Sequence, residues 1–451
     1  MKNAEKIAKF ITGINYDVVP LEVKEKLKTI LLHNLSIGIA DNSSMILAQN
    51  YLKMGSSEKS TEATIFFNGS STTAPKAALI NAIMFHSRAQ DDIQHSCGTH
   101  IGCIVIPAAL AIAESKRSNG KDFLRAILAA YEVTSYVGNE FSKATTLKGF
   151  RASGIYGPIG AATVASILYH LNEEQTASAL SLAANFSSGL NQTWIAGTSE
   201  YQLQTAMASM HGVLAAQLVL AGFNAAPDTF EGSKGFYNAY TGEPQNISDR
   251  LDSLGNSWDI LNVTLKPYPV CTINQVPVIK MMEIIQNNNI NAKNIKRINI
   301  TMNEYEAVYP GVDNQGPFNS SSATLMSIQF SFALAILYKT IRVDLLQLTE
   351  NEEILKLTKK IEVSKNEELP RYSSIISISL NDDRNITVEI NQGEKLLEYG
   401  WDRALQYITN IKNELMITPR QFDNLIAEIE KLEFKKDIRQ LIKSLSTESI
   451  S

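Results

Sequence analysis

Residues 77–114 read AALINAIMFHSRAQDDIQHSCGTHIGCIVIPAALAIAE. The apolar, Ala-rich runs on its two sides, Ala77 to Phe85 and Pro107 to Ser115, predict tightly packed and fully buried helices. The polar segment between them, His86 to His100, is then a loop or helix end held by a buried scaffold. Such positions often carry function. The stretch therefore predicts a helical framework with a site at a helix junction.

The same helical pattern runs through the first half of the chain. In Glu22 to Ile39, which follows Pro20, apolar residues recur at helical spacing. Gly160 to Tyr169 and Ala206 to Leu220 are further apolar runs rich in small residues, which let helix axes approach closely. Strand signals are scarce before about residue 290. This half is predicted to be all-helical.

The pattern changes after Pro269. Residues 298–302 alternate between apolar and polar, and Ser374 to Leu380 and Ile386 to Ile390 read as two strands joined by the turn Asn381-Asp382-Asp383-Arg384. An apolar helix around Phe330 lies among these strands. The region is predicted to be a smaller α+β domain.

Helical signals return at the end of the chain. Trp401 to Leu415 is amphipathic, and Thr418-Pro419 marks a new helix with Thr as N-cap and Pro at the first position. A chain of 451 residues exceeds the roughly 250–300 residues of one core. We therefore predict a mainly α fold: a large all-helical domain formed by both chain ends, residues 1–266 and 401–451, with a smaller α+β domain, residues 267–400, inserted between them.

Composition excludes several classes of function. Hydrophobic residues make up 44% of the chain, which is typical of a globular protein. The net charge is −5 and no basic stripe is present, so nucleic acid is not an expected partner. The three cysteines, Cys97, Cys103 and Cys271, have no Cys-x-x-Cys spacing. This argues against a disulfide framework and against a classical zinc or iron–sulfur site.

The location expected from the sequence is the cytoplasm. The N-terminal apolar stretch is broken by charges, and no small-residue cleavage site follows it, so we expect no signal peptide. The longest apolar stretch, Leu325 to Tyr338, is shorter than the roughly 20 residues of a membrane span. It is better interpreted as a buried helix.

Three of the six histidines, His86, His95 and His100, share one window with Asp91 and Asp92. A lone histidine usually satisfies a backbone group, but this density favours a site. His95 and His100 are five residues apart, unlike the two histidines of His-Glu-x-x-His, so we predict no metal. Acid–base chemistry suits the window better, because histidine titrates near neutral pH and aspartate can orient it.

Two further segments are candidates. In KGFRASGIYGPIGAATVAS, residues 148–166, Pro158 is predicted to open a helix whose free N–H groups bind a carboxylate or phosphate; the alternative is close helix packing around the glycines. It is not Gly-x-Gly-x-x-Gly, so no dinucleotide site is predicted. In KPYPVCTINQ, Lys266 to Gln275, a lysine on a stiffened backbone lies at the domain junction, either in a cleft or in a plain linker.

Together and in this order, the three segments resemble the MmgE/PrpD family, which includes 2-methylcitrate dehydratase, cis-aconitate decarboxylase and iminodisuccinate epimerase. KPYPVC at residues 266–271 is similar to the family's Lys-Pro-Tyr-Pro-x-Cys signature. The resemblance implies a helical domain with an α+β lid and a site between them. It also implies a homodimer that needs neither a metal nor an organic cofactor.

The resemblance implies proton removal next to a carboxylate of a small di- or tricarboxylate. His100 matches the family's catalytic histidine, Lys266 its lysine near the lid, and Asp91 and Asp92 its Asp pair. We accordingly predict catalytic His100, Lys266, Tyr156 and Tyr201, and substrate-binding Asp91, Asp92, His95, Arg151, Tyr268 and Cys271.

Several polar positions depart from the family pattern. Ala89 stands where an Asp is typical and Ile93 where a Thr follows the Asp pair; Arg151 replaces a His, Tyr201 a Lys and Gln204 a His. These changes predict a reshaped pocket in which Arg151 holds a carboxylate in a bidentate fork.

The leading hypothesis is a cofactor-independent lyase, of dehydratase or decarboxylase type, acting on a small polycarboxylate-like molecule. A first alternative is an epimerase or isomerase, with Lys266 opposed by Tyr156 or Tyr201. A second is a non-catalytic homologue that keeps the dimeric scaffold. The sequence specifies neither the substrate nor the pathway.

Overall fold

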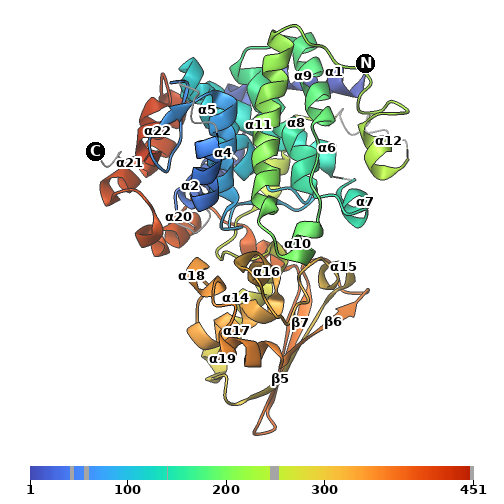
Figure 1. The fold of residues 1–451 in the computed structure, drawn as a ribbon, viewed down its shortest axis with the longest axis vertical. Coiled ribbons are helices and arrows are strands. Elements are labelled where there is room, and N and C mark those ends of the chain that lie inside the picture. The colour runs from blue at the N-terminus through green and yellow to red at the C-terminus, as the bar shows by residue number, and fades with distance from the viewer. Residues whose placement is uncertain (41–44, 55–59, 140, 244–252, 447–451) are drawn as a thin grey trace.

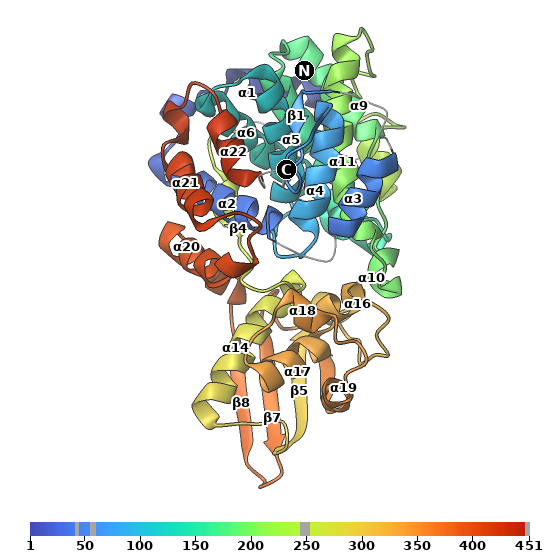
Figure 2. The same cartoon turned by 60° about the vertical axis from the view of Figure 1, so that its left-hand side comes forward.

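The computed structural model describes residues 1–40, 45–54, 60–139, 141–243 and 253–446. Figures 1 and 2 show two lobes, a larger one made of helices and a smaller one in which helices cover a sheet. We call the first, with elements α1–α12 and α20–α22, the helical lobe, and the second, from α14 to β8, the lid. The predicted fold class, mainly α with a small α+β part, is confirmed.

The helical lobe is built around α8 (Ala152–Leu168), every residue of which is buried. It packs against α5, α6, α9 and α11. The remaining helices up to residue 241 are α1 (Asn3–Gly13), α2 (Leu21–Gly38), α3 (Met45–Met54), α4 (Ala74–His86), α5 (Gly102–Lys116), α6 (Gly120–Gly138), α7 (Ser142–Leu147), α9 (Glu173–Asn185), α10 (Gln192–Ala196), α11 (Glu200–Leu220) and α12 (Phe236–Thr241), with the 3₁₀ turn η1 (Tyr16–Val18) and a short hairpin of β1 (Ala63–Thr64) and β2 (Ser71–Thr72).

Helix α8 begins earlier than predicted. It starts at Ala152, and Pro158 lies in its interior, so the predicted helix start at Pro158 is wrong. Proline cannot donate to the carbonyl four residues back. Here that carbonyl, of Gly154, accepts instead from the Ser188 N–H at 3.1 Å. A Cβ at Gly154 would lie 2.0 Å from the Ser188 oxygen, and one at Gly157 would lie 2.5 Å from Ile104. Close packing therefore explains Gly154 and Gly157, whereas Gly149 has open space around it and a φ of 90°, which favours glycine.

Helix α11 is, within the described residues, the one helix whose length and apolar composition would suffice to cross a membrane. Half of its apolar stretch is buried inside the protein, as in a core helix. Its length and composition alone are weak evidence for a membrane span.

The last helices return to the helical lobe. These are α20 (Trp401–Asn410), α21 (Pro419–Glu430) and α22 (Arg439–Leu445), with the 3₁₀ turns η4 (Lys412–Glu414) and η5 (Leu432–Phe434). The Lys28 Nζ of α2 donates to the Glu430 carbonyl at 2.7 Å and pairs with Glu433 at 2.8 Å. Thr418 is the N-cap of α21, as predicted, and it also forms a capping box with Gln421. Figure 2 shows these C-terminal helices beside α2.

The lid holds a four-stranded sheet in the order β6-β5-β7-β8. Strand β5 (Ile295–Asn303) runs parallel to β6 (Ile361–Asn366) and antiparallel to β7 (Ser374–Leu380), and β8 (Asn385–Ile390) is antiparallel to β7. Alternate residues of β7 are buried, which is the pattern of a sheet with one covered face. The helical elements of the lid are α14 (Thr272–Asn288), α15 (Glu304–Ala307), α16 (Ser321–Met326), α17 (Ile328–Tyr338), α18 (Val343–Leu346) and α19 (Glu352–Thr358), with η3 (Gly393–Leu397) after β8.

A short strand pair brings the histidine window to the segment that leads into the lid. Strand β3 (Ile93–Gln94) pairs antiparallel with β4 (Val263–Thr264), which follows the 3₁₀ turn η2 (Asp259–Asn262). Because Lys266 comes two residues after β4, this pairing places it beside the window.

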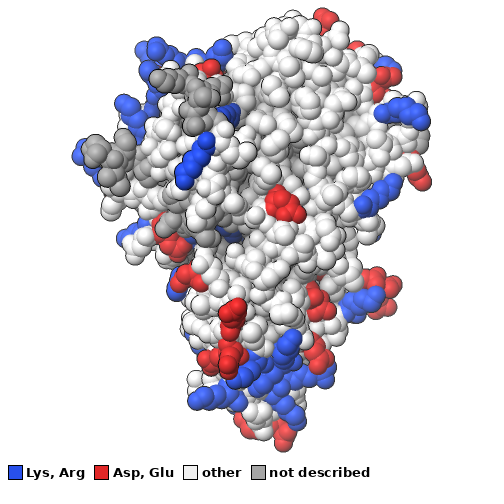
Figure 3. Space-filling view, in the orientation of Figure 1, with Lys and Arg blue, Asp and Glu red and all other residues white. Residues whose placement is uncertain are grey.

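Charged side chains are unevenly distributed on the surface. On the face drawn in Figure 3, much of the helical lobe is free of them, whereas Lys and Arg gather on the lid with Asp and Glu among them. Within the lid, Arg297 pairs with Glu362, and Lys365 with Glu304 at 2.6 Å. The lid surface is thus mixed in sign, unlike the uniformly basic face of a nucleic-acid-binding protein.

Candidate active site

A cavity of about 200 Å³ lies between residues of the helical lobe and residues of the lid. Its wall carries four cationic side chains, Lys143, Arg151, Lys266 and Arg371. No Asp or Glu belongs to that wall among the residues that the structure describes. A concave site with one sign of charge attracts small ligands of the opposite sign, so the cavity suits a small anion.

His100 lines this cavity. Its Nδ1 lies 2.9 Å from the Asp92 carbonyl oxygen and 3.1 Å from Asp91 Oδ2. Both neighbours are acceptors, so Nδ1 carries the proton and Nε2 keeps a lone pair. Burial and the nearby Lys266 charge lower the pKa of His100, so the ring is neutral at pH 7. His100 therefore has the protonation state of a general base.

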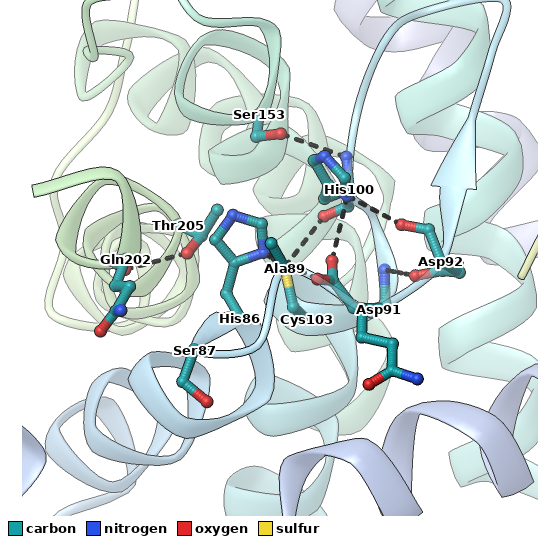
Figure 4. Close-up of polar contacts among 12 residues, drawn as sticks. His86, Ser87, Ala89, Asp91, Asp92, His100, Cys103, Ser153, Gln202 and Thr205 are labelled. Atoms are coloured by element: carbon teal, nitrogen blue, oxygen red, sulfur yellow. Dashed lines mark hydrogen bonds and ion pairs between the residues drawn. The ribbon is translucent and has the colours of Figure 1, made fainter. Parts of the chain in front are cut away.

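Asp91 links His100 to a second histidine. Its Oδ1 accepts from His86 Nδ1 at 2.9 Å, and Figure 4 shows both rings directed at this carboxylate. Although burial opposes ionisation, the contacts with His86 and His100 and the charge of Lys266 hold the pKa of Asp91 well below its usual range. Asp91 does not reach the cavity wall. It orients His100 and would stabilise the imidazolium that forms when His100 takes a proton.

Arg151 completes this chain of contacts. Its Nη2 lies 2.6 Å from His86 Nε2, and its Nη1 donates to the Tyr201 carbonyl and to Gln204 Oε1. The guanidinium also stands over the Trp194 ring at 5.1 Å. These bonds use three of the five N–H groups of arginine. Arg151 lines the cavity, but most of its planar fork is bound to protein.

Asp92 has a different role from its neighbour. Its Oδ1 accepts from the Gly102 N–H at 3.0 Å and its Oδ2 from the Tyr131 hydroxyl at 2.5 Å. Burial raises the pKa of Asp92 to about 7. The side chain thus anchors the start of α5, and the structure does not bring it to the cavity wall.

Lys266 is fully buried at the cavity wall and donates to the Ala89 carbonyl. Burial lowers its pKa, an effect that the charge of Asp91 opposes. Ala89 has a φ of 49°, in the left-handed region, where a non-glycine residue costs about 1–2 kcal/mol. This turn directs the Ala89 carbonyl at the lysine.

Two family models match the chain. The MmgE/PrpD N-terminal domain matches residues 5–247, and the MmgE/PrpD C-terminal domain matches residues 268–400. The chain belongs to the MmgE/PrpD family.

The chain is also similar, at low sequence identity, to three curated proteins. A cis-aconitate decarboxylase of Aspergillus terreus is 22% identical over 426 residues, which cover 87% of this chain and 83% of the relative. Its counterpart from Aspergillus terreus strain NIH 2624 / FGSC A1156 is 21% identical and covers 97% and 92%. The cis-aconitate decarboxylase-like protein oryM of Aspergillus oryzae is 23% identical over 66% of each chain.

Three predicted tyrosines lie outside the cavity of this MmgE/PrpD protein. The hydroxyl of Tyr156 lies 3.1 Å from Thr145 Oγ1, that of Tyr201 donates to the Ser87 carbonyl at 3.0 Å, and that of Tyr268 contacts Met282 Sδ at 3.3 Å. None belongs to the cavity wall. Burial also raises the pKa of Tyr201 to about 12. As placed here, these phenols are packing groups.

His95 and Cys271 do line the MmgE/PrpD cavity. His95 bridges the two lobes, since its Nδ1 lies 2.6 Å from the Tyr372 hydroxyl and its Nε2 2.7 Å from Thr264 Oγ1. Burial lowers the pKa of His95 to about 3 and raises that of Cys271 to about 11. At pH 7 the imidazole and the thiol are therefore both neutral.

The lid contributes residues to the MmgE/PrpD site that were not predicted from the sequence. Arg371 and Tyr372 come from the segment between β6 and β7, and Tyr305 and Tyr309 from around α15. Lys143, Ser153 and Trp194 complete the wall from the helical lobe. The only local signal for the first pair is an Arg-Tyr dipeptide after Pro370, which is too common a pattern to identify a site.

One group among the described residues has ligand atoms close enough for a metal: His86, Asp91 and Cys103, all within 4.8 Å of one another. The group does not suit a cation. Burial raises the pKa of the Cys103 thiol well above its usual value, so it stays protonated. His86 already contacts Asp91 through one nitrogen and the positive Arg151 through the other. No step is therefore assigned to a metal here.

Proposed function

We propose that this protein is a cofactor-independent lyase, of the dehydratase or decarboxylase type, that acts on a small polycarboxylate. One observation carries the proposal: His100, whose Nδ1 faces two acceptors, lines a cavity whose described wall has four cations and no carboxylate. A base beside fixed positive charge suits proton removal next to a carboxylate.

His100 is the base in this proposal. It takes a proton from the carbon next to a substrate carboxylate, and the ionised Asp91 beside its Nδ1 stabilises the imidazolium. Positioned general bases of this kind contribute roughly 10²–10⁴-fold to the rate. The hydrogen bond from Nδ1 to the Asp92 carbonyl keeps Nε2 directed at the cavity during the transfer.

Lys266 and Arg371 bind the substrate carboxylates in this proposal. Lys266 comes from the junction segment and Arg371 from the lid, so the two charges reach the cavity from different parts of the chain. Proton removal places negative charge on the carboxylate next to the reacting carbon, and a fixed cation lowers the energy of that enolate-like intermediate. In a dehydration, water then leaves from the neighbouring carbon. In a decarboxylation, the cations stabilise the carbanion that forms when CO2 departs and leaves its bonding electron pair on the substrate.

The names of the curated relatives favour decarboxylation as the first reaction to test. Their low identity, together with Ala89 and Arg151 at positions where the family typically has Asp and His, leaves the substrate open. A panel of small di- and tricarboxylates that includes cis-aconitate and 2-methylcitrate is therefore the proper assay.

The test follows each acid by nuclear magnetic resonance in deuterated water and measures released CO2. We expect loss of CO2 or water from at least one acid, and at least ~100-fold slower turnover by His100→Gln. The matched control is His170→Asn, because His170 is an exposed histidine at a left-handed position that Asn tolerates.

Two results would contradict the lyase proposal. Deuterium incorporation into recovered substrate, without loss of CO2 or water, would assign an epimerase. No turnover and no exchange of any acid would favour a non-catalytic homologue. Full activity of His100→Gln would remove His100 from its proposed role.

A further inference from the structure

Tyr372 has a backbone conformation that tyrosine rarely adopts. Its φ is 57°, in the left-handed region, which costs on the order of 1–3 kcal/mol for such a residue. Contacts on both sides hold this conformation, because the Tyr372 N–H donates to Glu306 Oε1 at 2.9 Å and its carbonyl accepts from the Gly393 N–H at 3.0 Å. The side chain that is positioned in this way reaches the cavity wall.

The phenol oxygen of Tyr372 has two nitrogen neighbours. Arg371 Nη2 lies at 3.1 Å and can only donate. His95 Nδ1 lies at 2.6 Å, while its Nε2 lies 2.7 Å from the Thr264 hydroxyl. Arg371 is held in turn by Glu306, whose Oε1 accepts from its Nε at 2.8 Å. The oxygen therefore sits in a fixed frame with contributions from both lobes.

His95 can complete this frame in two tautomers, because either ring nitrogen can carry its single proton. With the proton on Nδ1, His95 donates to the phenol oxygen, and Nε2 accepts from the Thr264 hydroxyl. The phenol oxygen then accepts from both Arg371 and His95, and its own hydrogen is free to point at a ligand. Burial raises the pKa of Tyr372, and the charge of Arg371 opposes that rise. Two donors at one oxygen likewise favour the phenolate that remains after proton transfer.

We propose that Tyr372 is the general acid of this site, facing the substrate from the lid while Arg371 and His95 hold its oxygen. The proposal rests on the proposed lyase function. That reaction needs an acid besides His100, and the phenols of Tyr156 and Tyr201 lie outside the cavity. Tyr305 and Tyr309 also line it, but in the described part of the chain neither hydroxyl has such a pair of donors.

The proton balance is simple for either lyase reaction. In a dehydration, His100 takes the C–H proton, the electron pair forms the double bond, and the hydroxyl leaves as water with the Tyr372 proton. In a decarboxylation, the electron pair of the breaking C–CO2 bond passes into the adjacent conjugated system, and the resulting carbanion takes the Tyr372 proton. The phenolate regains a proton from water in both cases, and after the dehydration His100 releases the proton that it took to water.

The experiment separates proton removal from product formation. Tyr372→Phe removes only the hydroxyl, and Tyr240→Phe is the matched control, since the hydroxyl of this half-buried tyrosine donates to the Ser187 carbonyl and Tyr240 does not line the cavity. Each variant, the wild type and His100→Gln are incubated with the turned-over acid in deuterated water. Deuterium entering recovered substrate and the rate of product release are both measured.

With an acid that is dehydrated, we expect Tyr372→Phe to form product at least ~100-fold more slowly while exchanging substrate hydrogen within about threefold of the wild-type rate. With an acid that is decarboxylated, no C–H bond breaks, so product formation alone is compared and the same fall is expected. Tyr240→Phe keeps both rates, and His100→Gln loses both. Product formation by Tyr372→Phe within threefold of wild type overturns the assignment, as does loss of exchange together with product. A wild-type protein inert toward the whole panel would overturn the lyase function itself, and with it this assignment.

Discussion

Arg151 Nη2 lies 2.6 Å from His86 Nε2, so a guanidinium is in direct contact with the outer histidine of the site. From there the contacts run through His86 Nδ1 to Asp91 and on to His100. Burial lowers the pKa of His86 to about 3, so this ring is neutral at pH 7. His86 therefore orients Asp91 through a hydrogen bond and does not carry a charge. Arg151 is accordingly a positioning residue in this structure.

The first prediction concerns Arg151→Gln. We expect kcat to fall roughly 10–100-fold with KM within about threefold, because the variant loosens His86 and Asp91 while leaving the carboxylate-binding Lys266 and Arg371 in place. Steady-state kinetics would measure kcat and KM separately, and Arg420→Gln, at an exposed arginine, is the control. A large rise in KM at unchanged kcat would instead show that Arg151 holds a substrate carboxylate.

The second prediction compares the two neighbouring aspartates. Asp91→Asn should reduce kcat at least ~100-fold, because it removes the charge between His86 and His100. Asp92→Asn should stay within about threefold of wild type, since the pKa of Asp92 is about 7 and an amide can serve both Gly102 and Tyr131. Equal losses in the two variants would refute this division of roles.

The third prediction concerns the charge of the cavity. Ala89→Asp places a carboxylate beside Lys266 and should raise KM at least ~10-fold, since like charges near 4 Å repel by about 4 kcal/mol at an intermediate dielectric. Ala89→Asn has the same shape, tolerates the left-handed backbone and carries no charge, so its KM should stay within about threefold. Equal KM values for the two variants would argue against an anionic ligand.

The fourth prediction concerns acid stability. Burial lowers the pKa of His33 to about 4 and those of His86 and His95 to about 3. Between these values and 6.5 the unfolded chain binds more protons than the folded one, so stability falls as pH drops through this window.

Each such histidine contributes a slope of about 1.4 kcal/mol per pH unit. Urea unfolding at several pH values would measure the combined slope, which is absent above pH 6.5. A free energy of unfolding that stays constant down to pH 4 would show that these rings are not held neutral.

Much of the fold could be predicted because its signals are local. The alternation in Ser374 to Leu380 and the turn after it define a hairpin, and Thr418-Pro419 defines a helix start, and both are as predicted. The start of α8 was missed because its interior Pro158 is compatible with a helix only through the distant Ser188 N–H, which bonds the freed Gly154 carbonyl. Local sequence does not reveal such a partner.

One side of the site was predicted because its signal is local, and the other side was not. The histidine window is conspicuous, because three histidines and two aspartates interrupt apolar helices. The lid wall is not, because Tyr372 meets His95 across 277 residues of sequence and carries no pattern of its own. The domain limits at residues 267 and 400, the homodimer and the cytoplasmic location remain predictions.

The return of the chain to its first lobe has a consequence for synthesis on the ribosome. The lid is one continuous segment, so all of it leaves the exit tunnel before the C-terminal helices are made. The helical lobe cannot close then, because Leu425, Ile429 and Leu441 belong to its core and are made after the lid. Part of the apolar surface of the N-terminal helices therefore stays exposed while the lid is translated. A chaperone could bind this surface during that interval.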